Sequence, residues 1–464
     1  MQATEDLKMP KKIEVADGSP TKGFFVRMIT RDITLEDCIL DLVDNSIDGA
    51  WKAEGGHPAS LESVTDLSKY NIDIIVKEDE FSITDNCGGI PLREAAEYAF
   101  TFGRRDADES DDFSIGVYGI GMKRAVFKMG RKISIVSTFA PETGKLEAFE
   151  VPIDVKEWLE RPNEKDWDFA IYAAKPAATA GVKLTVKSLT ADTAAEFGSP
   201  TFLTDLRRIL GRDYTLHLHF GLRITLNGKP IAGASLQLRS GGDYQPIRTR
   251  RTVPAGGGGT VTVEVIAGMG APPPETNAAD EAQGDERWGW YVICNGRVVL
   301  AGDKTSASGW GTDGWPQWHG QYNGFVGIVL FSSQDAALLP LTTTKRSVDT
   351  SSTVFRQARP TMRDIAKQWT AYTNLRKPVL EATKKLEDAT VAVPIYQIPM
   401  RTAMSLPSIA KPAKPKEQVA NINYTVPLPR LRKLAAAMDD PSMSYRELGL
   451  ETFEYAYRDY VGRD

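Results

Sequence analysis

The chain has 464 residues, of which 42% are hydrophobic and 25% are charged, a composition typical of globular domains with apolar cores. Its formal net charge of -5 does not indicate a nucleic-acid partner, and no apolar run reaches the roughly 18 residues that a membrane-spanning helix needs. The three cysteines stand in no paired spacing, which argues against a disulfide scaffold, so we expect a cytoplasmic protein without membrane contact.

The first predicted helix begins after Thr34, a good N-cap residue that is followed three positions later by Asp37. Along this helix Asp41, Asn45 and Asp48 recur at helical spacing and therefore share one face. An asparagine oxygen can bind Mg²⁺, and a carboxylate one turn earlier can deprotonate a water molecule. The alternative is a surface helix whose polar face is simply solvated.

A hairpin is predicted at 71–84, because two alternating apolar runs flank a polar turn. Its second strand leads into Asp85 and a turn that contains two glycines. A buried carboxylate at this place can accept a hydrogen bond from an adenine amino group, and Gly89 would let the base approach the backbone. A plain tight turn after the strand is the alternative. A helix is predicted to follow over 91–102.

Residues 103–115 are charged and without periodicity, which predicts a loop. A glycine pattern then opens a helix at 122–129, with Lys123 in its first turn. The glycines are Gly116, Gly119 and Gly121. Free backbone N–H groups at a helix start attract anions, and a lysine there opposes the helix dipole unless an anion is bound. Taken alone, a glycine-rich loop is weak support for a phosphate site.

The rest of the chain alternates between predicted strands and helices. Strands are predicted at 132–138, 146–152, 168–173, 182–187, 214–226, 229–238, 290–301 and 324–331. Helices are predicted at 201–211, 353–375 and 427–460, with a polar loop at 270–286 and a proline-rich linker at 389–418. His217 and His219 alternate along a predicted strand without a cysteine or carboxylate cluster, so no zinc site is expected.

The order of the three motifs resembles the three nucleotide-binding boxes of the GHKL superfamily (gyrase, heat-shock chaperone, histidine kinase, MutL). The motifs are D-x-x-x-N from Asp41, D-N-x-G-G from Asp85 and the glycine pattern that ends at Lys123. Residues 41–48 are similar to the E-L-V-x-N-S-x-D stretch of MutL and Microrchidia (MORC) ATPases. The resemblance is greatest to bacterial MORC-like ATP-binding proteins.

This resemblance implies an α+β protein in three parts. Residues 1–195 would form a Bergerat-fold α/β sandwich that binds ATP, with a lid at about 103–118. Residues 196–375 would form a transducer-like (ribosomal S5 domain 2-like) α/β domain, and 376–464 a helix, the linker and a short helical C-terminal segment. The transducer resemblance is carried by residues 201–235 and 289–349.

The resemblance also implies roles for individual residues. Asp41 would be the general base, Asn45 the Mg²⁺ ligand and Lys345 a lysine that reaches the ATP γ-phosphate. The nucleotide contacts would be Asn45, Asp48, Asp85, Gly89, Ile90, Gly116, Gly119, Ile120, Gly121, Met122, Lys123 and Thr185. An exposed loop lysine is the alternative for Lys345.

Several positions depart from the family pattern. Asp41 stands where the family has Glu and is one methylene shorter, so hydrolysis is expected to be slow. Cys87 replaces the first glycine of the second motif. Gly181 and Val182 occupy the place of a Gly-Thr pair, which weakens the expected threonine contact.

The leading functional hypothesis is a Mg²⁺-dependent ATPase whose ATP-bound form dimerises, with a protein partner or a DNA client in bacterial DNA-related or anti-phage defence. The alternative is a scaffold that holds ATP without hydrolysing it, which the shorter side chain of Asp41 favours. A histidine kinase is not expected, because no histidine precedes Thr34. A topoisomerase subunit, a repair endonuclease or a large chaperone would need further domains.

Overall fold

The computed structural model describes residues 14, 20–56, 61, 65–101, 120–141, 144–162, 167–274, 287–342, 345–409 and 420–462. The chain divides into two compact units, Met1–Ala410 and Lys411–Asp464, called unit 1 and unit 2 below. Within the ranges just given, no helix is both long enough and apolar enough to cross a membrane.

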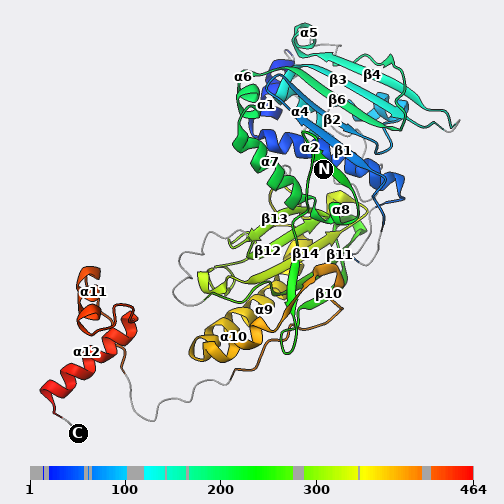
Figure 1. Cartoon of the computed structure of the whole chain (residues 1–464). Helices are drawn as coiled ribbons and strands as arrows, with labels where there is room; N and C mark the ends of the chain where they lie inside the picture. Colours follow the sequence, from blue (N-terminus) through cyan, green and yellow to red (C-terminus); the bar gives the residue numbers. More distant parts are fainter. Residues whose placement is uncertain are drawn as a thin grey trace, which may run out of the picture. The chain divides into compact units, whose positions relative to one another are not determined.

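Unit 1 contains an eight-stranded sheet in the order β5-β4-β3-β6-β2-β1-β7-β8 (Figure 1). Its strands are β1 (Asn71–Val76), β2 (Glu80–Asp85), β3 (Gly130–Phe139), β4 (Glu147–Asp154), β5 (Tyr172–Ala173), β6 (Gly181–Leu189), β7 (Arg223–Leu226) and β8 (Lys229–Pro230). Neighbouring strands run antiparallel, except that β1 pairs with β7 in parallel. Successive side chains alternate between the two faces, so Ile72, Ile74 and Val76 are all buried in the core.

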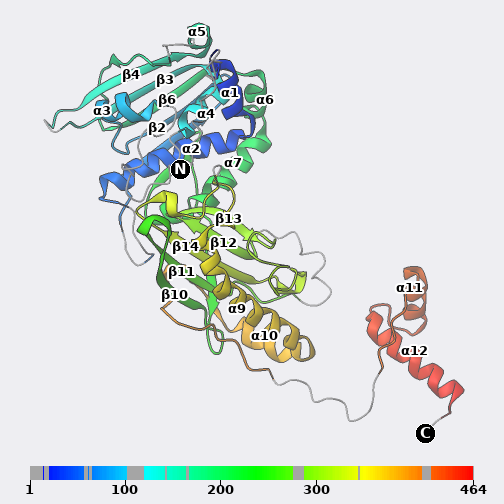
Figure 2. The same cartoon turned by 180° about the vertical axis from the view of Figure 1, so that it is seen from behind.

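Helices pack on the apolar face of this sheet, seen from both sides in Figures 1 and 2. They are α1 (Lys22–Arg31), α2 (Leu35–Ala53), α4 (Gly121–Met129), α5 (Val155–Glu160), α6 (Ala191–Phe197), α7 (Pro200–Asp213) and α8 (Thr215–His219). The short helix α3 (Leu92–Glu94) continues as a π-helical turn at Ala95–Ala99. Helix α2 starts where predicted, because the Thr34 hydroxyl accepts a hydrogen bond from the Asp37 N–H at 3.1 Å.

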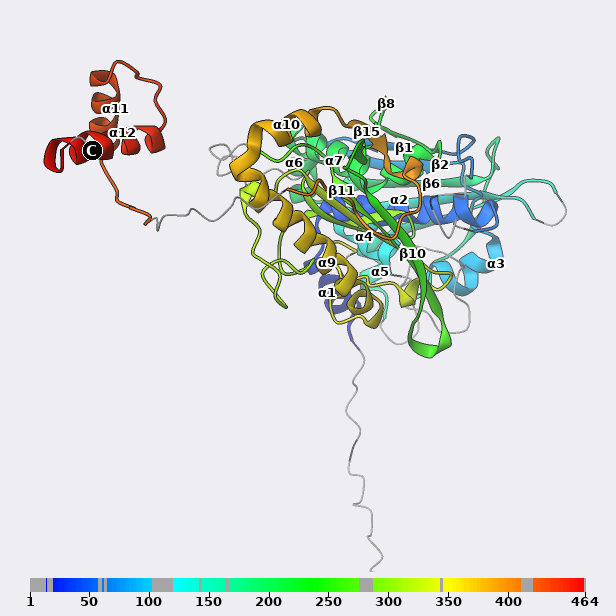
Figure 3. The ribbon, with the colours of Figure 1, turned by 90° about the horizontal axis from the view of Figure 1, so that it is seen from below.

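A second sheet of unit 1 has five strands in the order β10-β11-β14-β12-β13. They are β10 (Ile247–Pro254), β11 (Thr260–Met269), β12 (Gly289–Cys294), β13 (Arg297–Asp303) and β14 (Phe325–Ser332). Helices α9 (Thr353–Arg376) and α10 (Leu380–Asp388) lie beside it in Figure 3, and α9 buries Phe355 and Trp369. A two-stranded sheet pairs β9 (Gln237–Ser240) with β15 (Val391–Pro394).

In the described part of unit 2, residues 420–462, the helices are α11 (Leu428–Ala437) and α12 (Tyr445–Tyr460). Ser444 starts α12 with a reciprocal capping box to Glu447, which satisfies two backbone N–H groups. Both helices fall within the predicted helical segment 427–460.

Most predicted elements before residue 200 are confirmed, including the hairpin, whose strands β1 and β2 pair directly. Two of them differ, because the predicted strand at 168–173 is confined to Tyr172–Ala173 and the helix at 91–102 ends with the π-helical turn. After residue 200, the predicted strand 214–226 contains helix α8 before β7, and the predicted strand 229–238 is interrupted between β8 and β9. The predicted strand 290–301 is instead two antiparallel strands, β12 and β13. The run Thr215–His219 is too short for its alternation to distinguish a strand from a single helical turn.

Part of the predicted linker at 389–418 is packed structure. Val391–Pro394 pairs with β9, and the side chains of Ile395, Ile398 and Met404 are buried. Proline-rich composition predicted a linker here because it carries no information about pairing with a strand 150 positions away in sequence. The predicted loop at 103–115 lies outside the described residues.

Candidate functional site

Helix α2 carries the polar residues that the sequence singled out, but they do not share one environment. Asp41 is 3% exposed, Asn45 is exposed and Asp48 is half-buried. The alternative prediction of a solvated polar face is therefore wrong for Asp41, although it is correct for Asn45. The difference arises because α4 and a loop of the second sheet region pack against the Asp41 side of α2.

The Asp41 carboxylate is held between two cations. Arg124, on α4, donates to its Oδ2 from Nε at 2.9 Å and from Nη2 at 2.6 Å. The Nζ of Lys345 lies 3.4 Å from Oδ1. Gly121 allows this approach, because a Cβ at that position would lie 3.2 Å from the Asp41 carboxyl group. The start of α4, where phosphates were expected, thus lies directly against the predicted base.

One turn along α2, Asp44 forms the most buried ion-pair cluster of the site. It accepts hydrogen bonds from Arg297 of β13, from the Nζ of Lys345 at 2.8 Å and from the Tyr214 hydroxyl at 2.8 Å. Burial alone would raise the pKa of this carboxyl group, but the charges of Arg297 and Lys345 outweigh it and lower the pKa. Asp44 is therefore ionised and bonded to partners far away in sequence.

Lys345 lies in the loop between Leu341 and Val348, which form a β-bridge. Its φ of 55° is in the left-handed region, which is uncommon for a lysine and costs backbone energy. Burial opposes its charge, but the two carboxylates Asp44 and Asp41 raise its pKa, so it stays protonated. The lysine is buried, so the alternative of an exposed loop lysine is wrong.

Asp85 ends β2 and is linked to α2 through Ser46, whose hydroxyl donates to Oδ2 at 2.7 Å. Its Oδ1 accepts from the N–H groups of Cys87 at 2.9 Å and Val182 at 3.2 Å. Burial is the main influence on this carboxyl group and raises its pKa. A carboxylate has about four acceptor positions, so Asp85 can accept one more hydrogen bond.

Glycines let the backbone close around Asp85. Gly89 has a φ of +72°, and a Cβ there would lie 2.0 Å from the Thr138 carbonyl oxygen. A Cβ at Gly181 would lie 2.0 Å from the carbonyl oxygen of Asp85 itself. Beside them the Ile90 N–H donates to the Ser137 hydroxyl at 2.7 Å. The predicted contacts Gly89 and Ile90 are thus at the edge of the Asp85 turn.

The third motif is described only in part. Gly116 and Gly119 lie outside the described residues, whereas Ile120 is the N-cap of α4, which begins with Gly121 and Met122. Lys123 follows in the first turn of α4 and donates to the carbonyl oxygens of Ala99 at 3.0 Å and Thr101 at 2.5 Å. Burial lowers its pKa to about 8.

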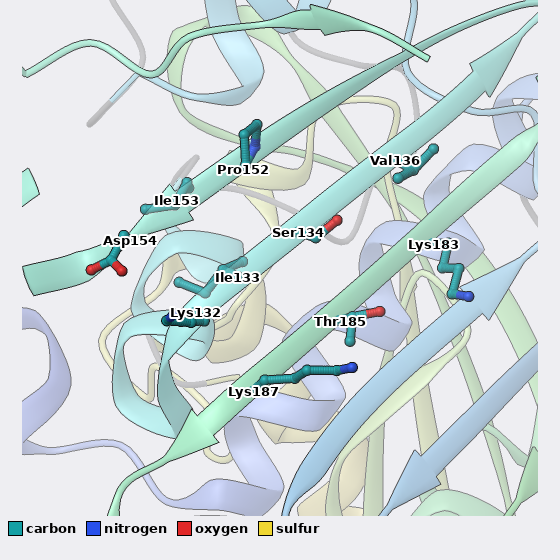
Figure 4. Close-up of a pocket in the computed structure, with 10 residues that line it drawn as sticks. All are labelled: Lys132, Ile133, Ser134, Val136, Pro152, Ile153, Asp154, Lys183, Thr185 and Lys187. Carbon is teal, nitrogen blue, oxygen red and sulfur yellow. The ribbon is translucent and has the colours of Figure 1, made fainter. Parts of the chain in front are cut away.

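Thr185 is not brought to this cluster. On β6 it pairs across from Ser82, whereas Leu184 and Val186 face the helices. Figure 4 shows it on the open face of the sheet, in a shallow pocket of about 480 Å³ with Lys183 and Lys187. Successive side chains of β6 point to opposite faces of the sheet. The contact of β6 with Asp85 is made by the Val182 N–H, three positions before Thr185.

The sequence did not indicate Asp44, Tyr214 or Arg297 as members of this site. Asp44 could have been found, because it stands next to Asn45 and one turn after Asp41. Tyr214 and Arg297 had no local signal, since they are 170 and 253 positions from Asp44.

In the described part of the chain, no group of three or more His, Cys, Asp or Glu side chains could hold a metal ion. A Mg²⁺ ion that binds together with a triphosphate needs fewer protein ligands, because phosphate oxygens and waters supply most of its coordination. The exposed amide of Asn45, one turn after Asp41, fits that requirement with a single neutral oxygen.

Residues 33–176 match the model of the family described as "Histidine kinase-, DNA gyrase B-, and HSP90-like ATPase". The match contains α2, β1 to β5 and α4, and thus Asp41, Asn45, Asp85 and Lys123. It supports a GHKL-type ATPase domain, and with it ATP binding, over these residues. No curated protein matches the chain.

Asp44→Asn is expected to lower the free energy of unfolding by about 3–5 kcal/mol, because Arg297 and Lys345 would keep their buried charges with one carboxylate fewer. Urea denaturation at pH 7 measures the difference. Asp32→Asn is the matched control, since the Asp32 side chain is 91% exposed. Equal stability of the two variants would contradict a structural role for the Asp44 ion pairs.

Proposed function

We propose that this chain binds ATP with Mg²⁺ between α2, the Asp85 turn and the start of α4, and hydrolyses it slowly to drive a conformational switch. The position of Lys345 is the strongest support for this proposal. Its ammonium group comes from outside the matched residues 33–176 and lies 3.4 Å from Asp41 and 2.8 Å from Asp44. A lysine from a distant segment that lies beside the proposed base is well placed to contact a γ-phosphate.

In this proposal the adenine amino group donates to Asp85, and the backbone at Gly89 borders the base. Asn45 supplies the protein oxygen for Mg²⁺, which neutralises charge on the phosphates when bound. The N–H groups at Gly121 and the ammonium group of Lys123 are suited to the phosphates, because the start of a helix is electropositive. Asp48, Ile120 and Met122 would border the nucleotide.

The charges around Asp41 and Asp44 favour the binding of an anion beside them. The two buried carboxylates Asp41 and Asp44 face three cations, Arg124, Arg297 and Lys345. The cluster of these five side chains carries one excess positive charge, and excluded water makes that charge attractive to a phosphate. We therefore assign Arg124 and Lys345 to the γ-phosphate in the ATP-bound state.

Hydrolysis would use Asp41 as the base. A water oxygen attacks the γ-phosphorus, its proton passes to the Asp41 carboxylate, and the bond to the bridging oxygen breaks to leave ADP and phosphate. Asp41 must first give up part of its pairing with Arg124, and its side chain is one methylene shorter than that of Glu. Both features predict a slow reaction.

The consequence of binding would be association of two copies through their ATP-bound units, as the resemblance to MORC-like and MutL-like proteins implies. A protein partner, a DNA client and a role in anti-phage defence rest on that resemblance alone. A second candidate is a scaffold that keeps ATP without turnover. The two hydrogen bonds from Arg124 to Asp41 favour it, because a carboxylate held this way is a poor base.

Asp85→Ala is expected to weaken ATP binding about tenfold or more, because a hydrogen bond to a charged group is lost. Thr185→Ala should leave affinity unchanged, since Thr185 faces the opposite side of the sheet. Isothermal titration with a non-hydrolysable ATP analogue and Mg²⁺ compares them. Equal affinities for the two variants would refute the proposed adenine contact.

Asp41→Asn is expected to slow ATP hydrolysis by roughly 10² to 10⁴, the usual contribution of a general base, while ATP still binds. Asp41→Glu restores the missing methylene and should hydrolyse ATP at least as fast as the wild type. Single-turnover assays with radiolabelled ATP measure both rates. If wild type and Asp41→Asn release phosphate equally slowly, the scaffold candidate is correct instead.

ATP affinity should fall as the pH rises from 7 to 9. The pKa of Lys123 is lowered by burial to about 8, so the side chain is charged below that pH and loses its charge above it. A triphosphate binds the charged form better, and up to about tenfold affinity per pH unit is lost above the pKa. Lys123→Arg keeps its charge and should flatten the profile. An unchanged slope in that variant would rule out Lys123 as the titrating group.

A further inference from the structure

Three aspartates of α2 form a row along one face of the helix. Asp37, Asp41 and Asp44 follow one another at steps of four and three residues, so each lies about one helical turn from the next. All three are buried. Buried carboxylates need cations or hydrogen-bond donors as partners, and this row receives its cations from segments outside α2.

Two successive residues of one loop contact both ends of this row. The Nζ of Lys345 lies 2.8 Å from Asp44 and 3.4 Å from Asp41. The next residue, Arg346, forms an ion pair through its Nε with Oδ1 of Asp37. The loop therefore has two separate contacts with α2, one at the candidate nucleotide site and one a helical turn before it.

The Arg346–Asp37 pair is fixed at its α2 end. Asp37 is in the first turn of the helix, where the free N–H groups favour a negative charge. Its own N–H donates to the Thr34 hydroxyl at 3.1 Å. The Asp37 side chain is 10% exposed and that of Arg346 is 27% exposed, so water competes less for this pair than for an ion pair at the surface.

The backbone of the loop explains why a second contact matters. Lys345 has a φ of 55°, a left-handed conformation that residues other than glycine rarely adopt. The bridge between Leu341 and Val348 and the hydrogen bond from the Lys345 N–H to the Thr342 carbonyl oxygen, at 2.9 Å, hold this conformation within the loop. Arg346 holds the same stretch of backbone to a separate helix, and it limits where the adjacent lysine side chain reaches.

Under the proposed function, ATP affects the two contacts differently. Lys345 has to leave Asp44 in order to reach a γ-phosphate, which removes one contact between the loop and α2. Asp37 lies seven residues from Asp44, or about 10 Å along the helix axis, and belongs to none of the proposed nucleotide contacts. Its pair with Arg346 is therefore free to persist while Lys345 moves.

We propose that Arg346 is a positioning residue of the ATPase. Its ion pair with Asp37 keeps the loop on α2 while the Lys345 ammonium group exchanges Asp44 for the γ-phosphate. This inference rests on the proposed function and adds to it a residue that acts through Lys345 without touching the nucleotide. Loss of the pair slows hydrolysis and leaves ATP binding intact, because the proposed adenine and Mg²⁺ contacts are on other segments.

Arg346→Ala tests this role. We expect single-turnover hydrolysis to slow roughly tenfold while ATP affinity stays within about twofold, because displacement of a catalytic group by about 1 Å costs up to about a hundredfold in rate. Lys187→Ala is the matched control, since it breaks the Lys187–Glu80 ion pair on the open face of the sheet and should change neither value. An unchanged rate in Arg346→Ala, or an equal loss in the control, would overturn the proposal.

Arg346→Lys keeps the positive charge and should retain most of the wild-type rate. Hydrolysis as slow as in Arg346→Ala would mean that the ion pair with Asp37 is not what matters. Urea denaturation of the wild type and both Arg346 variants shows whether each is folded under the assay conditions.

Combination with Lys345→Met distinguishes positioning from a general loss of stability. If Arg346 acts through Lys345, then Arg346→Ala should slow the Lys345→Met variant by less than about twofold, because the group that it positions is already absent. A further slowing as large as that seen in the wild type would overturn the proposal, since Arg346 would then act independently of Lys345.

Hydrogen exchange without nucleotide separates this inference from the proposed function. The Lys345 N–H should exchange several-fold faster in Arg346→Ala than in the wild type, because the loop opens more often when one contact is lost. Faster exchange in a chain that does not bind ATP would overturn the ATP function and confirm the contact. Unchanged exchange would overturn the positioning role, even in a chain that hydrolyses ATP.

Discussion

Asp44, in the middle of α2, is fully buried and bonded to Arg297 and Lys345 from two different segments of the second sheet region. Removing three charges from water is costly, and their mutual contact offsets much of that cost. The geometry of this cluster therefore fixes how α2 lies against β13 and the loop of Lys345. Tyr214 adds to the constraint, because its hydroxyl bonds both Asp44 and the Leu40 carbonyl oxygen.

The candidate nucleotide site depends on the same helix. One turn before Asp44, α2 presents Asp41 to Arg124, and two residues after it, Ser46 bonds Asp85. Any movement of Lys345 toward a γ-phosphate would have to weaken its contact with Asp44. In the proposed mechanism, this change of partner by Lys345 would couple ATP binding to the second sheet. The coupling arises because Lys345 and Arg297 of β13 share the Asp44 carboxylate.

Local features of this molecule were predictable from the sequence, and long-range ones were not. The start of α2 at Thr34, the hairpin of β1 and β2 and the turn at Gly89 follow from capping, alternation and backbone conformation, which act over a few residues. The burial of Asp41 and its pairing with Arg124 depend on residues 83 positions apart. Composition likewise predicted a linker where β15 pairs with β9, and alternation alone could not assign Thr185 to the correct face.

We propose that Lys345 completes an ATP site whose other parts lie in residues 33–176. This proposal is tested most directly by ATP affinity and single-turnover hydrolysis, measured with Mg²⁺ for the wild type and for Lys345→Met, after circular dichroism has shown that both are folded. We expect the variant to bind ATP within a few-fold of the wild type and to hydrolyse it at least about tenfold more slowly, because a cation at the γ-phosphate acts mainly on the transition state. Equal hydrolysis rates, or a wild type that binds no ATP at millimolar concentration, would contradict it.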